Sequence, residues 1–407
     1  MARISTLRPD GGIPAPTLLM MSAVAGLTVA NLYYNQPLLE DIRTDLACSG
    51  TLANLITVVT QAGYALGLLL IVPMADMWPR RRIVLSIMSI AAIMSAAISV
   101  SHSIWTVLTA SLGLGVCSVI PQIFIPIAGQ FSEPEHKSRN MGYILSGLLT
   151  GILGARVISG YVGQWAGWRT MFIVSAVLML LCLALTLRML PRMPGTFSGT
   201  YGSLIKSVWK IFVTHPRMRL YALRGACTFG SMMSIWACMA FHLAGEPFHA
   251  GSRTVGLLGL CGVVGAIAAS GIGRYVPRLG IRRMTAIGAI LQLAAWTSAA
   301  TLGHTYTGII TAIILLELGA QFMQLSNQSG CLQAVPDASN RANTIFMTSL
   351  FLGGSLATLL SGIGWRLSGW QGVCLTGAVF AVVPLLTVLK LRIFVIKNQD
   401  NAENSAS

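Results

Sequence analysis

The sequence predicts an all-α, polytopic membrane protein with twelve transmembrane helices in two pseudo-symmetric six-helix bundles. Three observations predict this fold. Of the 407 residues, 54% are hydrophobic and only 10% are charged, whereas about 25% of the residues in a soluble globular protein are charged. Apolar segments of about 20 residues, the length that crosses a bilayer, follow one another along the chain. Residues of the first half also recur in the second half at a constant spacing.

The gaps between charged residues predict the spans in order. In the first half they predict helices over 17–34, 46–75, 83–132 (two helices with a break near His102), 140–168 and 170–187. The first apolar run is too long for a signal peptide and lacks a small-residue cleavage site. A basic stretch over about 188–219 shows no periodicity. Six further helices are expected over 220–245, 254–273, 284–303, 307–330, 342–364 and 371–389.

The repeat defines the expected domains. Residue pairs that recur at the same offset are Pro134 and Pro336, Arg139 and Arg341, Gly160 and Gly362, Gly167 and Gly369, and Trp168 and Trp370. So many matches at one offset indicate a duplicated six-helix unit. We therefore expect a cytoplasmic tail over 1–14, an N-terminal bundle over 15–190, a linker over 191–217, a C-terminal bundle over 218–396, and a cytoplasmic tail over 397–407.

The distribution of Lys and Arg predicts the topology. With both termini inside, only Arg43, Arg169, Arg253 and Arg366 of the 27 Lys and Arg residues fall on the outer side, and Arg156 and Arg224 fall within spans. Because cytoplasmic loops carry the excess of basic residues, both termini are expected on the cytoplasmic side. The expected membrane is the bacterial inner membrane. This bias explains the net charge of +15 without a nucleic-acid partner.

A short motif follows the second expected span. Residues 72–81 read Val-Pro-Met-Ala-Asp-Met-Trp-Pro-Arg-Arg, and a degenerate copy begins at Gly273. The stretch resembles the G-x-x-x-D-R-x-G-R-R signature of the major facilitator superfamily, with Asp76, Arg80 and Arg81 matching. Val72, Met77 and Pro79 replace the first glycine, the first arginine and the second glycine. Together with the helix count and the duplication, the resemblance covers essentially the whole chain.

The resemblance implies a carrier that works by alternating access, most similar to bacterial twelve-helix drug and metabolite exporters. It also implies a conformational latch at the motif loops, formed by Asp76, Arg80, Arg81, Arg139 and Arg341, with Asp76 against the start of the eleventh helix. Two positions depart from the exporter pattern. Ser111 replaces the arginine usual in the fourth helix, and Arg156 occupies the proline position of the fifth-helix motif.

Glu317 is the strongest candidate for a functional residue. It lies deep in an apolar span, and the polar residues Gln321, Gln324 and Gln328 follow it on one helical face. A charge at the centre of a bilayer costs roughly 2.5–3.5 kcal/mol on insertion scales, so it is usually kept inside a bundle or cavity. Glu317 is expected to be the proton-coupling carboxylate, and the alternative is a structural glutamate that holds two helices together.

Other polar residues within spans form the expected substrate cavity. Arg156 is expected to face that cavity and bind a substrate anion or Glu317, and the alternative is a structural role. The remaining members of the expected cavity are Asn31, Tyr34, Asn35, Gln321, Gln324, Gln328 and Trp236. Arg156 favours an anionic substrate, whereas the Gln and Asn residues and Trp236 would suit a neutral polar one. For Asn31 and Asn35, hydrogen bonding between helices is an equally weighted alternative. Arg224 lies near a span end and is expected to snorkel to the cytoplasm.

The functional hypothesis is secondary active transport of a small organic solute, as proton-coupled efflux by a monomer in the lipid bilayer. No nucleotide-binding loop G-x-x-x-x-G-K-[ST] occurs in the chain, so the proton gradient is the expected energy source and no cofactor is expected. The eight cysteines show no metal or disulfide spacing, and no nucleophile–base pair suggests an enzyme. Proton-coupled or facilitated uptake is the alternative. A non-transporting sensor or scaffold is less favoured, because no soluble domain that could relay a signal is expected from the sequence.

Overall fold

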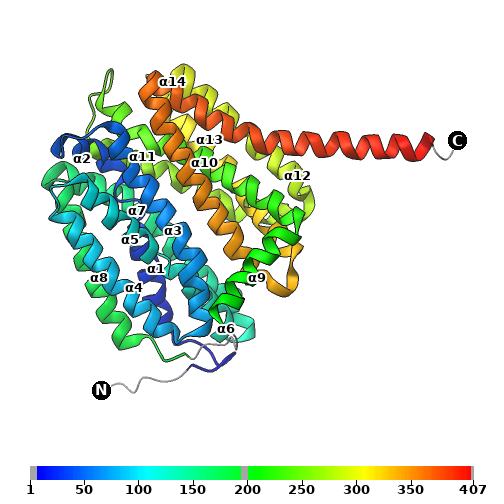
Figure 1. Ribbon diagram of the computed structural model, residues 1–407, viewed down its shortest axis with the longest axis horizontal. Helices are drawn as coiled ribbons and strands as arrows, with labels where there is room; N and C mark the ends of the chain where they lie inside the picture. Colours follow the sequence, from blue (N-terminus) through cyan, green and yellow to red (C-terminus); the bar gives the residue numbers. More distant parts are fainter. Residues whose placement is uncertain (1–6, 194–199, 405–407) are drawn as a thin grey trace. The chain divides into compact units, whose positions relative to one another are not determined.

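The computed structural model describes residues 7–193 and 200–404, and no strand occurs in these two ranges. Side chains are described there except for Asp76, residues 269–270, 273–275, 277, 337 and 390–404. The α-helices are α1 (Ala15–Ala30), α2 (Leu39–Asp45), α3 (Gly50–Met77), α4 (Arg80–Ser99), α5 (Ile104–Cys117), α6 (Ile120–Phe131), α7 (Lys137–Ala166), α8 (Trp168–Met189), α9 (Tyr201–Thr214), α10 (Pro216–Ala244), α11 (Ser252–Leu258), α12 (Gly262–Leu302), α13 (Tyr306–Ala334) and α14 (Ser339–Asn404) (Figure 1). Short 3-10 helices are η1 (Gln36–Leu38), η2 (Pro134–His136), η3 (Gly259–Cys261) and η4 (Pro336–Ala338).

The apolar helices of the structure correspond to the spans predicted from the sequence. Within the described ranges, nine helices are long and apolar enough to cross a membrane, and Ala15–Ala30 and Ser252–Ala268 are shorter apolar helices. The last of the nine, Ser339–Leu389, has non-helical backbone at Ser368 and Gly369. It therefore corresponds to the two expected spans over 342–364 and 371–389, and the all-α, twelve-span prediction is confirmed.

The duplication is visible in the backbone. Gly167, between α7 and α8, has φ of 82°, and Gly369, at the same offset in the second half, has φ of 59°. Glycine has no Cβ and so adopts positive φ without steric cost. The two 3-10 turns η2 and η4 also begin at the paired prolines Pro134 and Pro336. Both halves thus turn at a glycine with positive φ at the corresponding position.

Helix α9 corrects the expectation of an aperiodic linker over 188–219. Leu204, Val208 and Ile211 are its buried residues, and their steps of four and three place them on one helical face. The Tyr201 hydroxyl donates to the carbonyl of Leu70 in α3 at 2.8 Å, and its ring stacks on Trp78. The prediction was wrong because a moderately apolar, amphipathic helix is too polar to be recognised as a span.

The chain forms two compact units. Among the described residues, the first unit comprises those up to Thr214 with Trp236–Leu260, and the second comprises His215–Ile235 with those from Cys261 onward. In the first unit α1 packs on α7, α3 on α5, α4 on α8, and α11 on α7; α4 and α8 lie side by side in Figure 1. In the second unit α12 packs on α13 and α14. The domain boundaries at 190 and 218 stay a prediction about the duplicated halves.

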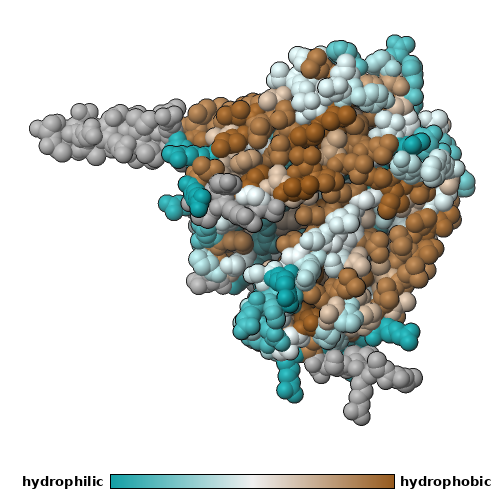
Figure 2. All heavy atoms as spheres, turned by 180° about the vertical axis from the view of Figure 1, so that it is seen from behind, coloured by the Kyte–Doolittle hydropathy of each residue, from teal (hydrophilic) through white to brown (hydrophobic). Residues whose placement is uncertain are grey.

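The surface matches a lipid environment. Large apolar side chains such as Trp165, Leu180, Ile267 and Leu367 are exposed. Figure 2 shows that hydrophobic residues cover much of one face, with hydrophilic residues gathered toward its edges. In water such patches would be unfavourable, whereas in a bilayer they contact acyl chains.

Candidate functional site

Arg156 is almost completely buried within the first unit, at 2% exposure. Its Nε donates to Oε1 of Gln36 in η1 at 2.8 Å. Its Cζ lies 4.9 Å from the centroid of the Tyr33 ring and 4.2 Å from that of Trp236. An arginine keeps its charge even when buried, and stacking on aromatic faces is one of the ways a protein stabilises it. These contacts place Arg156 and Trp236, both predicted cavity residues, in one cluster.

Trp236 contributes a hydrogen-bond donor that lacks an acceptor in the described part of the chain. The side chain is 1% exposed, and its indole Nε1 has no hydrogen-bond partner among the described atoms. Leaving a buried donor without a partner costs about 1–3 kcal/mol, so an unmet N–H beside a guanidinium is a place for an acceptor. The cluster therefore offers positive charge and a donor together.

Close helix packing fixes the Arg156 backbone. A Cβ added to Gly256 of α11 would lie 2.5 Å from the Arg156 carbonyl oxygen, and one on Gly160 of α7 would lie 3.0 Å from the Gly256 Cα. The aliphatic part of Arg156 is also held, because a Cβ on Gly259 would lie 2.9 Å from its Cβ. The glycines thus let α7 and α11 touch through their backbones.

The polar stripe after α1 is engaged in hydrogen bonds between helices. Asn31 accepts from Ser175 at 2.8 Å, and Asn35 accepts from Thr57 and donates to Thr60, each at 3.2 Å. The adjacent Tyr34 is 2% exposed. This geometry is the structural alternative stated for Asn31 and Asn35, while substrate contact by these residues and Tyr34 stays a prediction.

Helix α1 ends at Ala30, four residues before the expected end of the first span, and a series of turns leads into η1. Pro37 lies in η1, where it supplies no backbone N–H, so a regular helix does not continue through it. This change of helix type presents Tyr33 and Gln36 to Arg156.

Glu317 lies in the second unit at 8% exposure, near the middle of α13. Its carboxylate lies against the backbone of α12, because a Cβ on Gly265 would come within 3.3 Å of Glu317 Oε2. Cys261 is near enough for its thiol to interact electrostatically with the carboxylate. The small glycine therefore makes the room in which the acid is buried.

The glutamines after Glu317 are half-buried. Gln328 donates to Asn343 of α14 at 2.8 Å. The preceding residue, Asn327, is fully buried and donates to Thr285 of α12 at 3.0 Å. For Gln321, Gln324 and Gln328, the cavity role stays a prediction.

The motif arginines bind within the first unit. Arg80 donates to the Ala75 carbonyl at 3.2 Å and to Gln130 at 2.7 Å, and Arg81 donates to the Leu187 carbonyl at 2.5 Å. These bonds tie the start of α4 to α3, α6 and α8. The side chain of Asp76 lies outside the described residues; Arg139 is exposed and Arg341 is half-buried. The latch stays a prediction.

The burial of two polar residues, Gln61 and Arg224, was not predicted from the sequence. Gln61 of α3 is 2% exposed, and neither its oxygen nor its nitrogen has a hydrogen-bond partner among the described atoms. Arg224 was expected to snorkel, but it is 2% exposed and donates to Thr387 of α14 at 2.9 Å, so that prediction was wrong. Thr387 is 163 positions from Arg224 in the sequence, so no local sequence pattern indicated this contact. No group of three potential metal ligands occurs among the described residues.

Comparison with known proteins supplies the family. The family model of the Major Facilitator Superfamily matches residues 18–358. An uncharacterized transporter, YgaY of Escherichia coli O157:H7, is 37% identical over 380 residues, which are 93% of this chain and 96% of YgaY. The inner membrane transport protein YnfM of Escherichia coli K12 is 25% identical, covering 92% of this chain and 90% of YnfM. The solved structure of a point mutant of the nucleoside transporter NupG superposes with a TM-score of 0.75 at 15% identity, covering 92% of this chain and 99% of the NupG chain.

Proposed function

The chain belongs to the Major Facilitator Superfamily and is a multi-pass membrane transporter, and from this premise we propose that it exports a small organic anion in exchange for protons. Transport would proceed by alternating access in a bacterial inner membrane, with both termini in the cytoplasm. YgaY is described only as an uncharacterized transporter, so the proposal depends on the site residues.

The observation that carries the proposal is the cluster around Arg156. A buried guanidinium that contacts two aromatic rings, beside an indole N–H of Trp236 that has no hydrogen-bond partner among the described atoms, favours a ligand that brings negative charge and an acceptor oxygen. A carboxylate supplies both, because it is negatively charged and its two oxygens accept hydrogen bonds. The flanking rings of Tyr33 and Trp236 would suit an apolar body next to the carboxylate.

Glu317 would supply the coupling. A carboxylate buried in a span can be carried neutral or charged, and the change between these forms is a proton taken up or released. We propose that Glu317 releases its proton when the substrate enters and recovers it when the cavity reopens to the other side. The half-buried Gln321, Gln324 and Gln328 on the same face would hold water along the proton route.

The latch would control the balance between the two open states. Asp76 would act with Arg80, Arg81, Arg139 and Arg341 at the motif loops rather than contact substrate. Asp76→Asn is expected to slow turnover and shift the conformational balance while leaving the substrate Kd largely unchanged. A much weaker Kd with an unchanged balance would remove Asp76 from this role.

The experiment that tests the function is transport in everted membrane vesicles. A panel of aromatic and aliphatic carboxylates, neutral metabolites and drugs would be screened with and without an inward-acid pH gradient. Accumulation of a carboxylate that depends on the gradient and collapses with a protonophore is expected. Gradient-independent equilibration, or accumulation only in right-side-out vesicles, would favour facilitated transport or uptake instead.

A further inference from the structure

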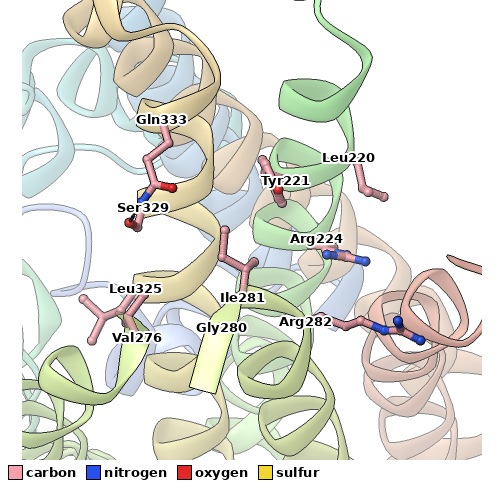
Figure 3. Close-up of a pocket in the computed structure, with 10 residues that line it drawn as sticks. All are labelled: Leu220, Tyr221, Arg224, Val276, Gly280, Ile281, Arg282, Leu325, Ser329 and Gln333. Carbon is pink, nitrogen blue, oxygen red and sulfur yellow. Dashed lines mark hydrogen bonds between the residues drawn. The ribbon is translucent and has the colours of Figure 1, made fainter. Parts of the chain in front are cut away.

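A cavity in the second unit shares no residue with the candidate site. Its volume is about 690 Å³, within the range of about 300–1,000 Å³ usual for small-molecule pockets. The lining residues come from α10, the bent region of α12, and the end of α13, as Figure 3 shows. They are Leu220, Tyr221, Arg224, Val276, Gly280, Ile281, Arg282, Leu325, Ser329 and Gln333.

The residue that makes this cavity a candidate site is Arg224. The residue is 2% exposed, yet its Nη2 has no hydrogen-bond partner among the described atoms. The Nε of the same guanidinium donates to Thr387 Oγ1 at 2.9 Å. A buried guanidinium with an unmet donor is costly unless an anion or another acceptor meets it.

The charges around Arg224 increase that need. Arg282 also lines the cavity, and the two guanidinium groups interact electrostatically as like charges. Figure 3 draws these two arginines on one side of the cavity and Ser329 with Gln333 on the other. Among the ten lining residues none is acidic. The described lining therefore holds positive charge without a counter-charge of its own.

The remaining lining residues indicate the shape of the ligand. Tyr221, Ser329 and Gln333 add hydroxyl and amide groups that can donate to an oxyanion. Leu220, Val276, Ile281 and Leu325 form apolar walls. We propose that this cavity binds the phosphate group of an amphiphilic anion, with the phosphate oxygens at Arg224 and Arg282 and the apolar part along the aliphatic walls.

The cavity uses a different face of α13 from the proton-coupling face. Leu325, Ser329 and Gln333 follow one another in steps of four, and at 100° per residue they are centred roughly 100° around the helix from Glu317 and the polar residues Gln321, Gln324 and Gln328. The cavity residues of α13 therefore lie apart from the face that carries Glu317.

The phosphate group could belong to a soluble organic phosphate or to an anionic phospholipid, and two experimental arms distinguish these sources. In the first, the purified full chain in detergent is titrated with hexyl phosphate, with hexanol as the control that lacks the anion, and the thermal unfolding midpoint is measured. In the second, the chain is placed in phosphatidylcholine nanodiscs with or without phosphatidylglycerol, and retained lipid is counted by native mass spectrometry.

The test variants are Arg224→Met and Arg282→Gln, and the matched control is Arg283→Gln. Arg283 is exposed and adjacent to Arg282 but is not among the cavity-lining residues. Saturable stabilisation by hexyl phosphate, or specific retention of phosphatidylglycerol, is expected in the wild type and in Arg283→Gln. Arg224→Met should abolish the effect and Arg282→Gln should weaken it about tenfold or more, because charge-assisted hydrogen bonds are lost.

Arg282 is exposed, so Arg282→Gln keeps the test decisive even if Arg224→Met fails to fold. The proposal is overturned if neither probe binds the wild type, or if Arg282→Gln binds as Arg283→Gln does. It is also overturned if Arg156→Met removes the hexyl phosphate response while Arg224→Met retains it, since the anion would then bind at the candidate transport site. A response in only one arm identifies the source of the phosphate.

Discussion

The guanidinium of Arg156 lies over the indole ring of Trp236, with Cζ 4.2 Å from the ring centroid. The two residues come from α7 and α10, about 80 positions apart, and both are almost completely buried. Trp236 thus has two separable features: an aromatic face that stabilises the cation and an N–H without an acceptor among the described atoms.

This pair gives the first prediction. Trp236→Phe keeps an aromatic face and removes the N–H, so the Kd for an anionic substrate should rise about 10- to 100-fold, the effect of one lost hydrogen bond to a charged group. Trp236→Leu also removes the ring and should lower transport further. Binding and transport would be measured by scintillation proximity and in proteoliposomes. Wild-type affinity in Trp236→Phe would exclude the N–H from the substrate site.

Arg156 itself should show a requirement for charge. Arg156→Lys is expected to retain slow transport, because a cation remains, and Arg156→Met is expected to abolish it. Circular dichroism and size-exclusion chromatography should show a folded protein in both variants. Full activity of Arg156→Met would leave the residue with a packing role only.

The third prediction concerns the contact of α1 with α7. A Cβ on Gly151 would lie 2.1 Å from the Gly26 carbonyl oxygen, whereas nothing lies within 4 Å of a Cβ on Gly142 of the same helix. Gly151→Ala should therefore destabilise by about 1–3 kcal/mol, because backbone must move. Gly142→Ala should stabilise by about 0.5–1 kcal/mol, because alanine loses less conformational entropy.

Thermal unfolding midpoints of the two alanine variants in one detergent would test this contrast. Both variants replace glycine by alanine in α7, so the difference in helix propensity between the two residue types affects both unfolding midpoints equally. Equal midpoints would show that α1 and α7 can separate at Gly151 without cost.

The spans were predictable because the bilayer imposes a length and a polarity that can be read locally. Amphipathic α9 was not, because it is only moderately apolar and Leu204, Val208 and Ile211 are interspersed with basic residues. Arg156 and Glu317 were predictable as candidates because a charge in an apolar run is conspicuous. The contacts of these two residues were not predictable. Gln36, for example, is 120 positions from Arg156 in the sequence, and only the folded chain brings Gln36 and Arg156 together.

The sequence did not predict the burial of uncharged polar residues or of polar residues near helix ends. Gln61 carries no charge, so nothing distinguished it from an interhelical amide, although both of its polar atoms lack partners among the described atoms of the fold. Arg224 lies near the start of α10, and its burial depends on Thr387 of α14. Such facts come from tertiary packing, which periodicity does not encode.

The topology is the fourth subject of prediction. Both termini and the connection that holds α9 with Lys206 are expected in the cytoplasm. The loop containing Glu246 is expected outside, because basic residues concentrate in the connections assigned to the cytoplasm. Alkaline phosphatase fused after Glu246 should be active, and green fluorescent protein fused after Lys206 should fluoresce. The reverse pattern would invert the orientation of every span.

Asp41 gives a prediction for pH, and it lies in α2, outside the spans. Burial raises the pKa of its carboxyl, the nearby Glu40 adds to the rise, and Ser252 at the start of α11 opposes it. A raised pKa means that the packed state prefers the protonated acid. Its contribution to stability is therefore fully present below the ordinary value of 3.8 and is lost as the pH rises through the raised pKa.

Asp41→Asn mimics the protonated form, so the unfolding midpoint should become less dependent on pH above 3.8 and should exceed that of the wild type near neutrality. Glu135→Gln, a change at an exposed acid, should keep the wild-type dependence. Midpoints measured by scanning fluorimetry across this range would decide, and a lower midpoint for Asp41→Asn near neutrality would show that the charged form is the stabilising one.

Glu317 gives the last prediction, on energy coupling. Its position about eleven residues into α13 corresponds to a depth of about 16 Å, close to the middle of a bilayer. Glu317→Gln keeps the shape of the side chain against Gly265 but cannot exchange a proton, so gradient-driven accumulation should fall to background. Substrate counterflow, which needs no net proton movement, should continue. Gln324→Leu is the companion variant on the same face; it should slow the driven reaction without uncoupling it. If Glu317→Gln accumulates substrate as the wild type does, the residue is structural and the coupling proton binds elsewhere.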